Sequence, residues 1–476
     1  MQHQVIEPNP WMILPFGLLL GTIALAPVWA RDWWLKHYPK VAYTLGAITL
    51  AYYAFVLHAY ERILHAGHEY LSFIVLIGAL YIVSGGIHIT VKGEATPHNN
   101  TIFLLIGAVL ANLLGTTGAS MLLIRPWIRM NKYRITSYHI VFFIFVVSNV
   151  GGCLTPVGDP PLFLGYLKGI PFWWVAEHCW PMWLVGVGFL LALFYVLDSL
   201  NYRRAPRHVR EQLAEPSDEW RFSGLWNIAW LGVILGAVFV TRPIFVREAL
   251  MAGAAVGSWF TTRKEVHAAN HFDFHPIQEV AILFIGIFAT MLPALDWLQG
   301  NAARLGQPTP GLFYWGSGVL SSVLDNAPTY LSFLSASFGL FVDPEVIDKV
   351  QQLVQHHGQD LSTVTGPHAQ EILNTFASLQ KYHAEVLASG VVTTEQIEVA
   401  FLLGNATYNH YILAISIGAV FFGACTYIGN GPNFMVKIIA DQQKVHTPGF
   451  GGLIFKYTLP YLLPVLLLVW LLFFRR

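Results

Sequence analysis

The segments GCLTPVGDPP (residues 152–161) and GACTYIGNGP (residues 423–432) decide the fold of this chain. Both read Gly-x-x-Thr-x-x-Gly-(Asp/Asn)-x-Pro, and both lie inside long apolar runs. Glycine and proline at this density interrupt a helix, because proline lacks the N–H donor and clashes with the preceding turn. One such segment alone is compatible with a kinked helix. Two copies at corresponding positions indicate two broken helices in related halves of the chain.

Composition indicates a membrane protein. Hydrophobic residues make up 55% of the chain and charged residues 11%, against about 25% charged residues in a typical soluble domain. Apolar runs such as residues 172–198 exceed the roughly 18 residues that indicate a transmembrane helix. The net charge of +0 gives no bulk attraction to nucleic acid. The sequence therefore predicts an all-α polytopic membrane protein whose surroundings are the lipid bilayer.

We expect about ten transmembrane helices and two re-entrant hairpins. The predicted single spans are 11–30, 41–58, 70–91, 172–198, 224–241, 243–262, 277–295 and 451–473. The first half, 1–200, contains hairpin 101–124 and broken helix 138–166. A cytoplasmic linker, 201–223, follows it. The second half, 224–476, contains hairpin 312–338, insertion 342–398 and broken helix 399–440. Five crossings per half is an odd number, so the second half must be inverted relative to the first.

The distribution of Lys and Arg predicts the orientation. Basic clusters occur at 31–40, 125–134, 203–210 and 263–264, and all fall on one side if the first hairpin leaves where it entered. Because cytoplasmic loops are rich in Lys and Arg, we expect this side to be cytoplasmic and both termini to lie outside. Arg242, Arg247, Arg475 and Arg476 would then lie outside, against the rule. The predicted location is the inner (cytoplasmic) membrane.

The polar segment 342–398 is predicted to be a helical insertion outside the membrane. It separates the second hairpin from the second break and explains why they are farther apart than in the first half. Two pairs in it, His357 with Asp360 and His368 with Glu371, have the spacing of one helical turn. A metal site is conceivable there, but a solvated helix produces such pairs without one.

Two carboxylates occur at the interruptions, Asp159 at the first break and Asp325 at the second hairpin tip. Ionisable groups at membrane depth usually serve function. Sodium is a hard cation that prefers oxygen ligands, and removal from water favours the protonated form of a carboxylate. Sodium and protons could therefore compete for these two groups. The alternative for each aspartate is helix capping or stabilisation of a hairpin. Further oxygen ligands are predicted at Thr116, Thr117, Ser120, Asn149, Thr155, Asn326, Thr329, Thr426, Asn430 and Asn433.

Three classes of function were compared. A secondary transporter explains the matched pairs of broken segments, whereas a membrane scaffold or sensor that uses the 342–398 insertion does not. The sequence shows no nucleophile–base set, phosphate-binding loop or transition-metal motif, so we do not expect an enzyme or a resident cofactor. The three cysteines have no metal-binding or disulfide spacing.

These motifs resemble the ion-transporter superfamily that includes arsenite pumps, citrate and dicarboxylate carriers, and the D-type bacterial sodium/proton antiporters. The antiporter branch is the most similar at SNVGG (148–152), TPVGDPP (155–161), LDNAPTY (324–330), TYIGNGPN (426–433) and TTGAS (116–120). The resemblance covers nearly the whole chain outside 342–398. Related sequences are also described as citrate transporters. Carriers of the superfamily hold substrate carboxylates with Ser-Asn-Thr at both hairpin tips, a signature that is absent here.

The resemblance implies a secondary transporter that exchanges sodium or lithium for protons by alternating access. Asp159 and Asp325 would be the exchanging carboxylates. The alternative is a sodium- or proton-coupled carrier of citrate or another carboxylate. An aspartate at an anion site would add like-charge repulsion, which favours a cation as the substrate. Members of the superfamily tend to dimerise, so a homodimer is the one protein partner that the resemblance suggests.

Overall fold

The computed structural model describes residues 7–90, 95–204, 221–240, 243–306, 308–356, 361 and 364–475. These residues are mostly helical; their one sheet pairs β1 (His88–Thr90) with β2 (Arg221–Ser223). Six of the described helices are long and apolar enough to cross a membrane, or up to eight if each of two bent helix pairs is one span. The chain is thus an all-α polytopic membrane protein, while the number of ten crossings stays a prediction. The predicted linker 201–223 lies outside the described residues between 205 and 220.

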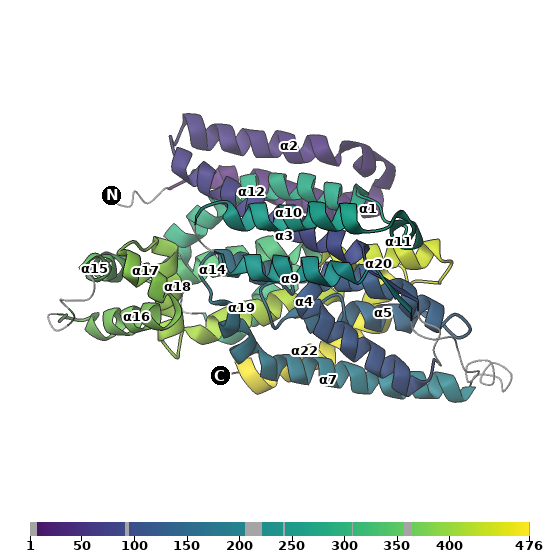
Figure 1. The fold of residues 1–476 in the computed structure, drawn as a ribbon. Helices are drawn as coiled ribbons and strands as arrows, with labels where there is room; N and C mark the ends of the chain where they lie inside the picture. The colour runs from purple at the N-terminus through teal and green to yellow at the C-terminus, as the bar shows by residue number, and fades with distance from the viewer. Residues whose placement is uncertain are drawn as a thin grey trace.

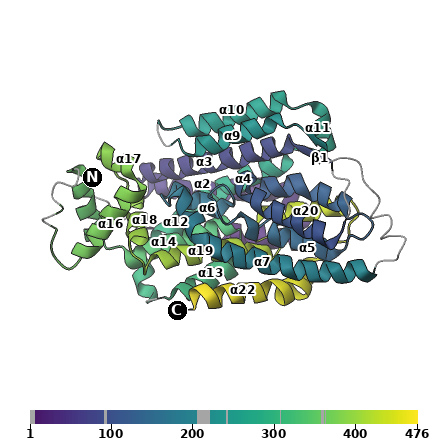
Figure 2. The same cartoon turned by 60° about the horizontal axis from the view of Figure 1, so that its bottom comes forward.

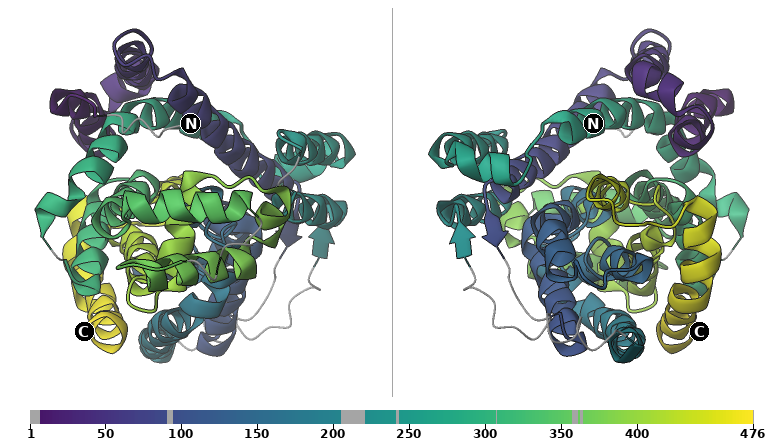
Figure 3. Two further views of the ribbon diagram at one scale, coloured as in Figure 1. Left: turned by 90° about the vertical axis from the view of Figure 1, so that its left-hand side faces the viewer. Right: turned by 90° about the vertical axis from the view of Figure 1, so that its right-hand side faces the viewer.

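One set of helices forms a frame along one side of the molecule (Figure 1, Figure 3). Its members are α1 (Leu14–Trp29), α2 (Arg31–Phe55), α3 (Tyr60–Gly85), α9 (Trp226–Val238), α10 (Val246–Thr261) and α12 (His275–Asn301), with short α11 (Lys264–Ala269) after α10. The second and third helices begin about ten residues before the predicted spans, so the basic cluster 31–40 is helical and not a connector. Hydropathy marks where a helix becomes apolar, whereas hydrogen bonding marks where it begins.

Helix α4 (Pro97–Met130) is a hairpin. Gly115 has φ 73°, a left-handed conformation that glycine adopts without strain, and the chain reverses there. The Asn100 and Asn131 side chains exchange hydrogen bonds of 2.9 and 3.1 Å, and Phe103 stacks on Trp127 at 5.4 Å. A straight helix of 34 residues would hold its ends about 50 Å apart. We call this segment hairpin 1.

The second hairpin, called hairpin 2, consists of α13 (Pro310–Val323) and α14 (Asn326–Phe341). Phe313 and Phe333 pack edge to face at 5.5 Å, so its two helices lie side by side. Helix α14 ends at Phe341, three residues before the first helix of the 342–398 segment begins at Pro344. The open end of hairpin 2 therefore adjoins that segment.

Each half also contains a broken helix. The first consists of α5 (Ser137–Val146), the 3-10 turn η2 (Val150–Gly152) and α6 (Pro160–Leu167). The second consists of α19 (Asn409–Phe422), η5 (Gly423–Cys425) and α20 (Gly431–Gln442). The predicted start of the second at residue 399 is wrong. Residues 399–404 belong to α18 (Thr394–Gly404), which is bent by 102° from α19, and the Asn405 side chain accepts the Thr407 N–H in the bend.

Four helices, α15 (Pro344–Gln355), α16 (Ala369–Tyr382), α17 (Ala384–Ser389) and α18, form a cap at one end of the molecule (Figure 1, Figure 2). Val350, Phe376 and Ile397 form part of its buried apolar side. His368 bonds Glu371 directly, with Nδ1 2.7 Å from Oε2, so this pair is satisfied without a metal. The pair His357 and Asp360 lies outside the described residues.

Helix α7 (Phe172–Arg204) extends from the cap to the base of hairpin 1. Gly169, just before it, packs against Gln396 of the cap, whereas Asp198 near its other end bonds Asn100 at the base of hairpin 1. The 27 residues from 172 to 198 span about 39 Å. The two hairpins thus open toward opposite ends of the molecule, as an inverted repeat requires. The boundaries of the two halves, 1–200 and 224–476, stay a prediction.

The last described helix alternates between α-helical and π-helical hydrogen bonding. It consists of α21 (Phe450–Leu453), the π-helical η6 (Ile454–Leu462), α22 (Leu463–Val469) and the π-helical η7 (Trp470–Phe474). Tyr314 of hairpin 2 donates a hydrogen bond to the Leu466 carbonyl at 3.0 Å. The last helix therefore packs against the first helix of hairpin 2.

Candidate functional site

The two glycines of each break face each other. A Cβ on Gly158 would lie 2.1 Å from the Gly152 carbonyl oxygen. In the second break, a Cβ on Gly429 would lie 2.7 Å from the Gly423 carbonyl oxygen. Side chains larger than hydrogen do not fit at these positions without movement of the backbone. The shared Gly-x-x-Thr-x-x-Gly spacing is therefore a packing requirement of both breaks.

The threonine of each motif attaches its break to a hairpin. The Thr155 hydroxyl donates to the Asn112 carbonyl of hairpin 1 at 2.6 Å and accepts the N–H of the second motif glycine at 3.0 Å. The Thr426 hydroxyl donates to the Ser322 carbonyl of hairpin 2 at 2.6 Å and accepts the corresponding N–H at 3.1 Å. These two predicted ligands have the same structural role in both breaks.

The tip of hairpin 1 touches the first break. The N–H of Thr116, next to the left-handed Gly115, donates to the Gly158 carbonyl at 2.7 Å. The hydroxyl of Thr116 donates to Oδ1 of Asp159, also at 2.7 Å. The tip therefore positions both the backbone and the carboxylate of the break.

Asp159 lies where all four interrupted segments meet. It is 1% exposed and accepts hydrogen bonds from Thr116 of hairpin 1, from Asn430 of the second break (3.0 Å) and from Asn326 of hairpin 2 (2.7 Å). Within the described residues, no Lys, Arg or His lies within 4.0 Å of this carboxylate. Its side chain makes no capping hydrogen bond to α6. Helix capping therefore does not explain Asp159, whereas its bonds to Thr116 and Asn326 also fit the alternative of hairpin stabilisation.

Two amide oxygens beside Asp159 are unsatisfied. Asn326 is 0% exposed and Asn430 is 1% exposed, and in the described part of the chain the Oδ1 atom of each accepts no hydrogen bond. Because each amide nitrogen bonds the Asp159 carboxylate, each unpaired oxygen lies close to it. Buried polar groups normally have partners, so unpaired ones require an explanation. Carboxylate and amide oxygens are the donors that hard cations prefer.

A second layer of amides orients the first. Asn149 Oδ1 accepts from Asn430 at 3.1 Å, and Asn149 Nδ2 donates to Asn433 Oδ1 at 2.7 Å. Asn433 in turn donates to the Gly423 carbonyl at 2.8 Å. Both asparagines are 0% exposed. The predicted residues Asn149 and Asn433 thus join the site through Asn430 and do not touch the carboxylate of Asp159.

Asp325 has a different environment from Asp159. Its carboxylate accepts the Ala327 N–H at 3.1 Å as the N-cap of α14, so the capping alternative holds for one of its oxygens. The residue is partly exposed. Thr329 donates to the Asp325 carbonyl at 3.1 Å, a bond within its own helix. The structure shows no direct bond between Asp325 and Asp159.

Two other predicted ligands lie near the site without touching Asp159. The Ser120 hydroxyl is 2.8 Å from that of Ser148, at the start of the first break. Thr117 lines a small cavity of about 20 Å³ beside Asp159, which is room for about one water molecule. The opposite wall is apolar and comes from α3, with Leu76 and Leu80. The cavity therefore lies between the frame and the tip of hairpin 1.

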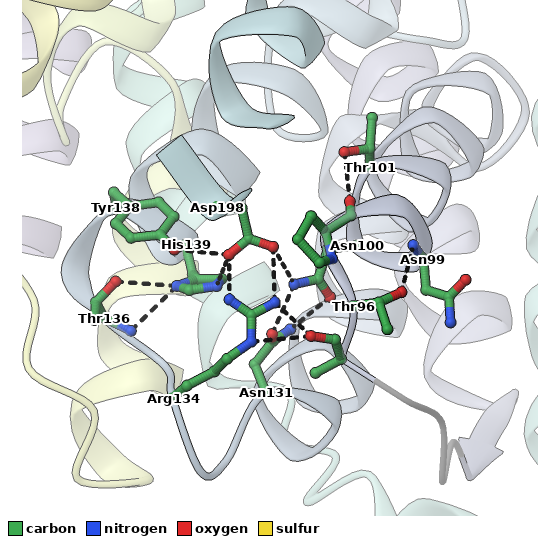
Figure 4. Close-up of polar contacts among 12 residues, drawn as sticks. Thr96, Asn99, Asn100, Thr101, Asn131, Arg134, Thr136, Tyr138, His139 and Asp198 are labelled. Atoms are coloured by element: carbon green, nitrogen blue, oxygen red, sulfur yellow. Dashed lines mark hydrogen bonds and ion pairs between the residues drawn. The ribbon is translucent and has the colours of Figure 1, made fainter. Parts of the chain in front are cut away.

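A buried cluster that the sequence analysis missed holds the base of hairpin 1 (Figure 4). Asp198, 0% exposed, accepts hydrogen bonds from Arg134, from Asn100 at 2.8 Å and from Tyr138 at 2.7 Å. His139 Nε2 lies 3.1 Å from the same carboxylate. The sequence placed Arg134 in a basic loop and Asp198 at a span end, and no spacing connects them. Their pairing depends on the return of α7 toward the start of α5, and the reversal of the chain at Gly115 brings Asn100 to the same carboxylate.

Comparison with curated proteins gave no match. Residues 6–474 match the family described as "Putative citrate transport". The match covers both hairpins, both breaks and the cap. The chain belongs to this family of membrane transporters.

Proposed function

We propose that this chain is a secondary active transporter that exchanges sodium or lithium for protons, with Asp159 as the carboxylate for which the two ions compete. The observation that carries the proposal is the buried Asp159 carboxylate, which has only neutral donors around it and two unpaired amide oxygens beside it. A desolvated carboxylate with no cationic partner favours uptake of a positive charge. A proton and a monovalent hard cation each neutralise the single negative charge of this carboxylate.

The two broken helices meet at Asp159. Asp159 and Asn430 each directly precede the N-terminus of a half-helix, α6 and α20, and the partial positive charge of these ends favours the ionised form of the Asp159 carboxylate. Transporters place coupling-ion sites between discontinuous helices near the middle of the membrane. In this proposal Asn326 and Asn430 supply ligand oxygens, Asn149 and Asn433 orient them, and partly exposed Asp325 is a second carboxylate on the ion path.

A sodium- or proton-coupled citrate carrier is the second candidate, and the family description favours it. Citrate carries several carboxylates and needs donors or cations to bind it. The groups that contact Asp159 are one hydroxyl and two amides, and the carboxylate itself would repel an anion. In a citrate carrier, Asp159 would therefore hold the coupling cation, and citrate would bind elsewhere.

Proteoliposomes that contain a pH-sensitive dye separate the two candidates. With a preset pH gradient and purified protein, sodium or lithium should dissipate the gradient without citrate. Asp159→Asn should abolish this effect, and Asp325→Asn should reduce it. Asp343→Asn is the matched control, because Asp343 is also an N-cap residue, lies in the exposed part of the cap and remains a capping residue as asparagine.

Uptake of radiolabelled citrate is measured in the same vesicles. If the vesicles take up citrate, and sodium or lithium moves no protons without citrate, the chain is a citrate carrier and not an exchanger. Loss of both activities in Asp159→Asn would then assign Asp159 to coupling. An inner-membrane location, outside termini and a homodimer complete the proposal.

A further inference from the structure

A second buried charge cluster lies at the other end of the helix that begins at Asp159. Lys168, 6% exposed, is the C-cap of α6. Its Nζ lies 2.7 Å from Glu69 of α3 and 2.8 Å from Glu395 of α18. Glu69 is 6% exposed, whereas the Glu395 side chain is 24% exposed. One ammonium group thus connects the site-bearing helix to the frame and to the cap.

The cluster continues into the frame. Arg62 of α3 pairs with Asp296 of α12 at 2.8 Å, and Tyr53 of α2 donates to the same carboxylate at 2.7 Å. A longer contact of 3.9 Å connects Arg62 to Glu395. The Lys168 cluster is therefore linked through Arg62 to frame helices α2 and α12.

The same carboxylates have the geometry of a metal site, but they already hold a cation. Ligand atoms of His65, Glu69 and Glu395 lie within 4.8 Å of one another. The Lys168 ammonium contacts both carboxylates at hydrogen-bond distance. A metal ion would have to displace it, so the arrangement fits an ion-pair cluster of the protein itself.

The Lys168 cluster and the cavity beside Asp159 lie along the same two helices, α3 and α6. Glu69, Leu76 and Leu80 are seven and four residues apart on α3, a spacing that places them on one face of the helix. Leu76 and Leu80 line the cavity beside Asp159. Asp159 is the N-cap of helix α6 and Lys168 is its C-cap, about 14 Å away along the helix. The seam between α3 and α6 therefore has the cavity at its inner end and the Lys168–Glu69 ion pair at its outer, cap-side end.

We propose that the Lys168–Glu69 ion pair is a gate that closes the cap-side end of the α3–α6 seam and separates when an ion reaches Asp159 from that side. A buried ion pair often adds no more stability than apolar residues of similar volume would, so its use here needs a reason other than stability. An ion pair can separate and hydrate, whereas packed leucines have no comparable open state. Glu395 stabilises the closed gate by tying Lys168 to the cap.

The gate rests on the proposed transport function, and thiol labelling tests it without any transported ion. Leu76→Cys is introduced into protein whose three buried cysteines, Cys153, Cys179 and Cys425, are replaced by alanine. A membrane-impermeant methanethiosulfonate reagent then reports how often the cavity opens in lipid nanodiscs. Glu69→Gln should raise the labelling rate at least tenfold, because Lys168 then keeps only the partly exposed Glu395 as its carboxylate partner.

Control variants separate a gate from general loosening. Lys168→Arg keeps the charge and should keep labelling slow, whereas Lys168→Met should raise it. Glu61→Gln removes an exposed carboxylate from the same helix and should change nothing. If Lys168→Met does not fold, Glu395→Gln replaces it, because that partner is already 24% exposed.

Unchanged labelling in folded Glu69→Gln and Lys168→Met (or Glu395→Gln) protein would overturn the gate. Equal acceleration by Glu61→Gln would overturn it as well, because the effect would then not depend on the ion pair. Neither result depends on sodium, lithium or citrate. Failure of the gate is therefore distinguishable from failure of the exchange proposal.

Discussion

Replacement of Asp159 by asparagine should remove the ion site and leave the fold intact. An asparagine in the same orientation keeps one oxygen, which can still accept from Thr116 and Asn430. Its NH₂ group takes the place of Oδ2 and faces the Asn326 amide nitrogen at 2.7 Å. Rotation of the Asn326 amide brings its unpaired oxygen to this new donor. Because residue 159 then keeps the same number of hydrogen bonds and a buried charge is removed, the free energy of unfolding should change by no more than about 1 kcal/mol.

Thermal unfolding in detergent measures both parts of this prediction. Sodium that binds only the folded protein should stabilise the native chain by about 1.4 kcal/mol at ten times its dissociation constant. The apparent Tm of the native protein and of the Asp343→Asn control should rise with sodium chloride and not with choline chloride. Asp159→Asn should match the native Tm without sodium and show no rise with it.

Two results would refute the reasoning. A sodium-dependent rise of native size in Asp159→Asn would show that sodium binds elsewhere. A large loss of stability in Asp159→Asn without sodium would show that Asn326 cannot reorient, and the hydrogen-bond assignment around Asp159 would be wrong.

Three further predictions concern stability and use the same Tm measurement, with Glu61→Gln as the neutral reference. Gly158→Ala should destabilise the protein by about 3 kcal/mol or more, because its Cβ would lie 2.1 Å from a facing carbonyl oxygen; a native Tm would contradict the close packing of the break. Thr426→Val should cost about 1–3 kcal/mol, because a buried N–H and a carbonyl lose their hydroxyl partner; an unchanged Tm would show that the hydroxyl does not attach the break. Asp198→Asn should cost about 3–5 kcal/mol, because the buried Arg134 guanidinium loses its carboxylate; a native Tm would show that the base of hairpin 1 does not depend on this pair.

Much of the site was predictable because its residues are attached to visible interruptions. Asp159, Asn326 and Asn430 each follow or adjoin a Gly- or Pro-rich break, and polar residues at such breaks in an apolar chain stand out. The sequence does not distinguish the roles of these polar residues. Thr155 and Asp159 are four positions apart in one motif, yet one attaches the break to a hairpin and the other has the central carboxylate.

The charge clusters could not be predicted. Lys168 and Glu395 are more than two hundred residues apart, and neither occurs in a motif. The sequence also does not show where α19 starts, because α18 is apolar enough for α18 and α19 together to be taken as one membrane span. Its apolar face packs within the cap, and hydropathy does not tell burial in protein from burial in lipid.

The sequence by itself determined the membrane class, the two hairpins and the two matched breaks, because composition, glycine and proline act locally on the backbone. The tertiary structure decided which polar groups meet. It brought Thr116, Asn326 and Asn430 onto one carboxylate and left Asp325 as a helix cap. The physical reason is that hydrogen bonds and ion pairs act over a few ångströms in space, and the segments that carry them here are separated by up to 271 positions in the chain.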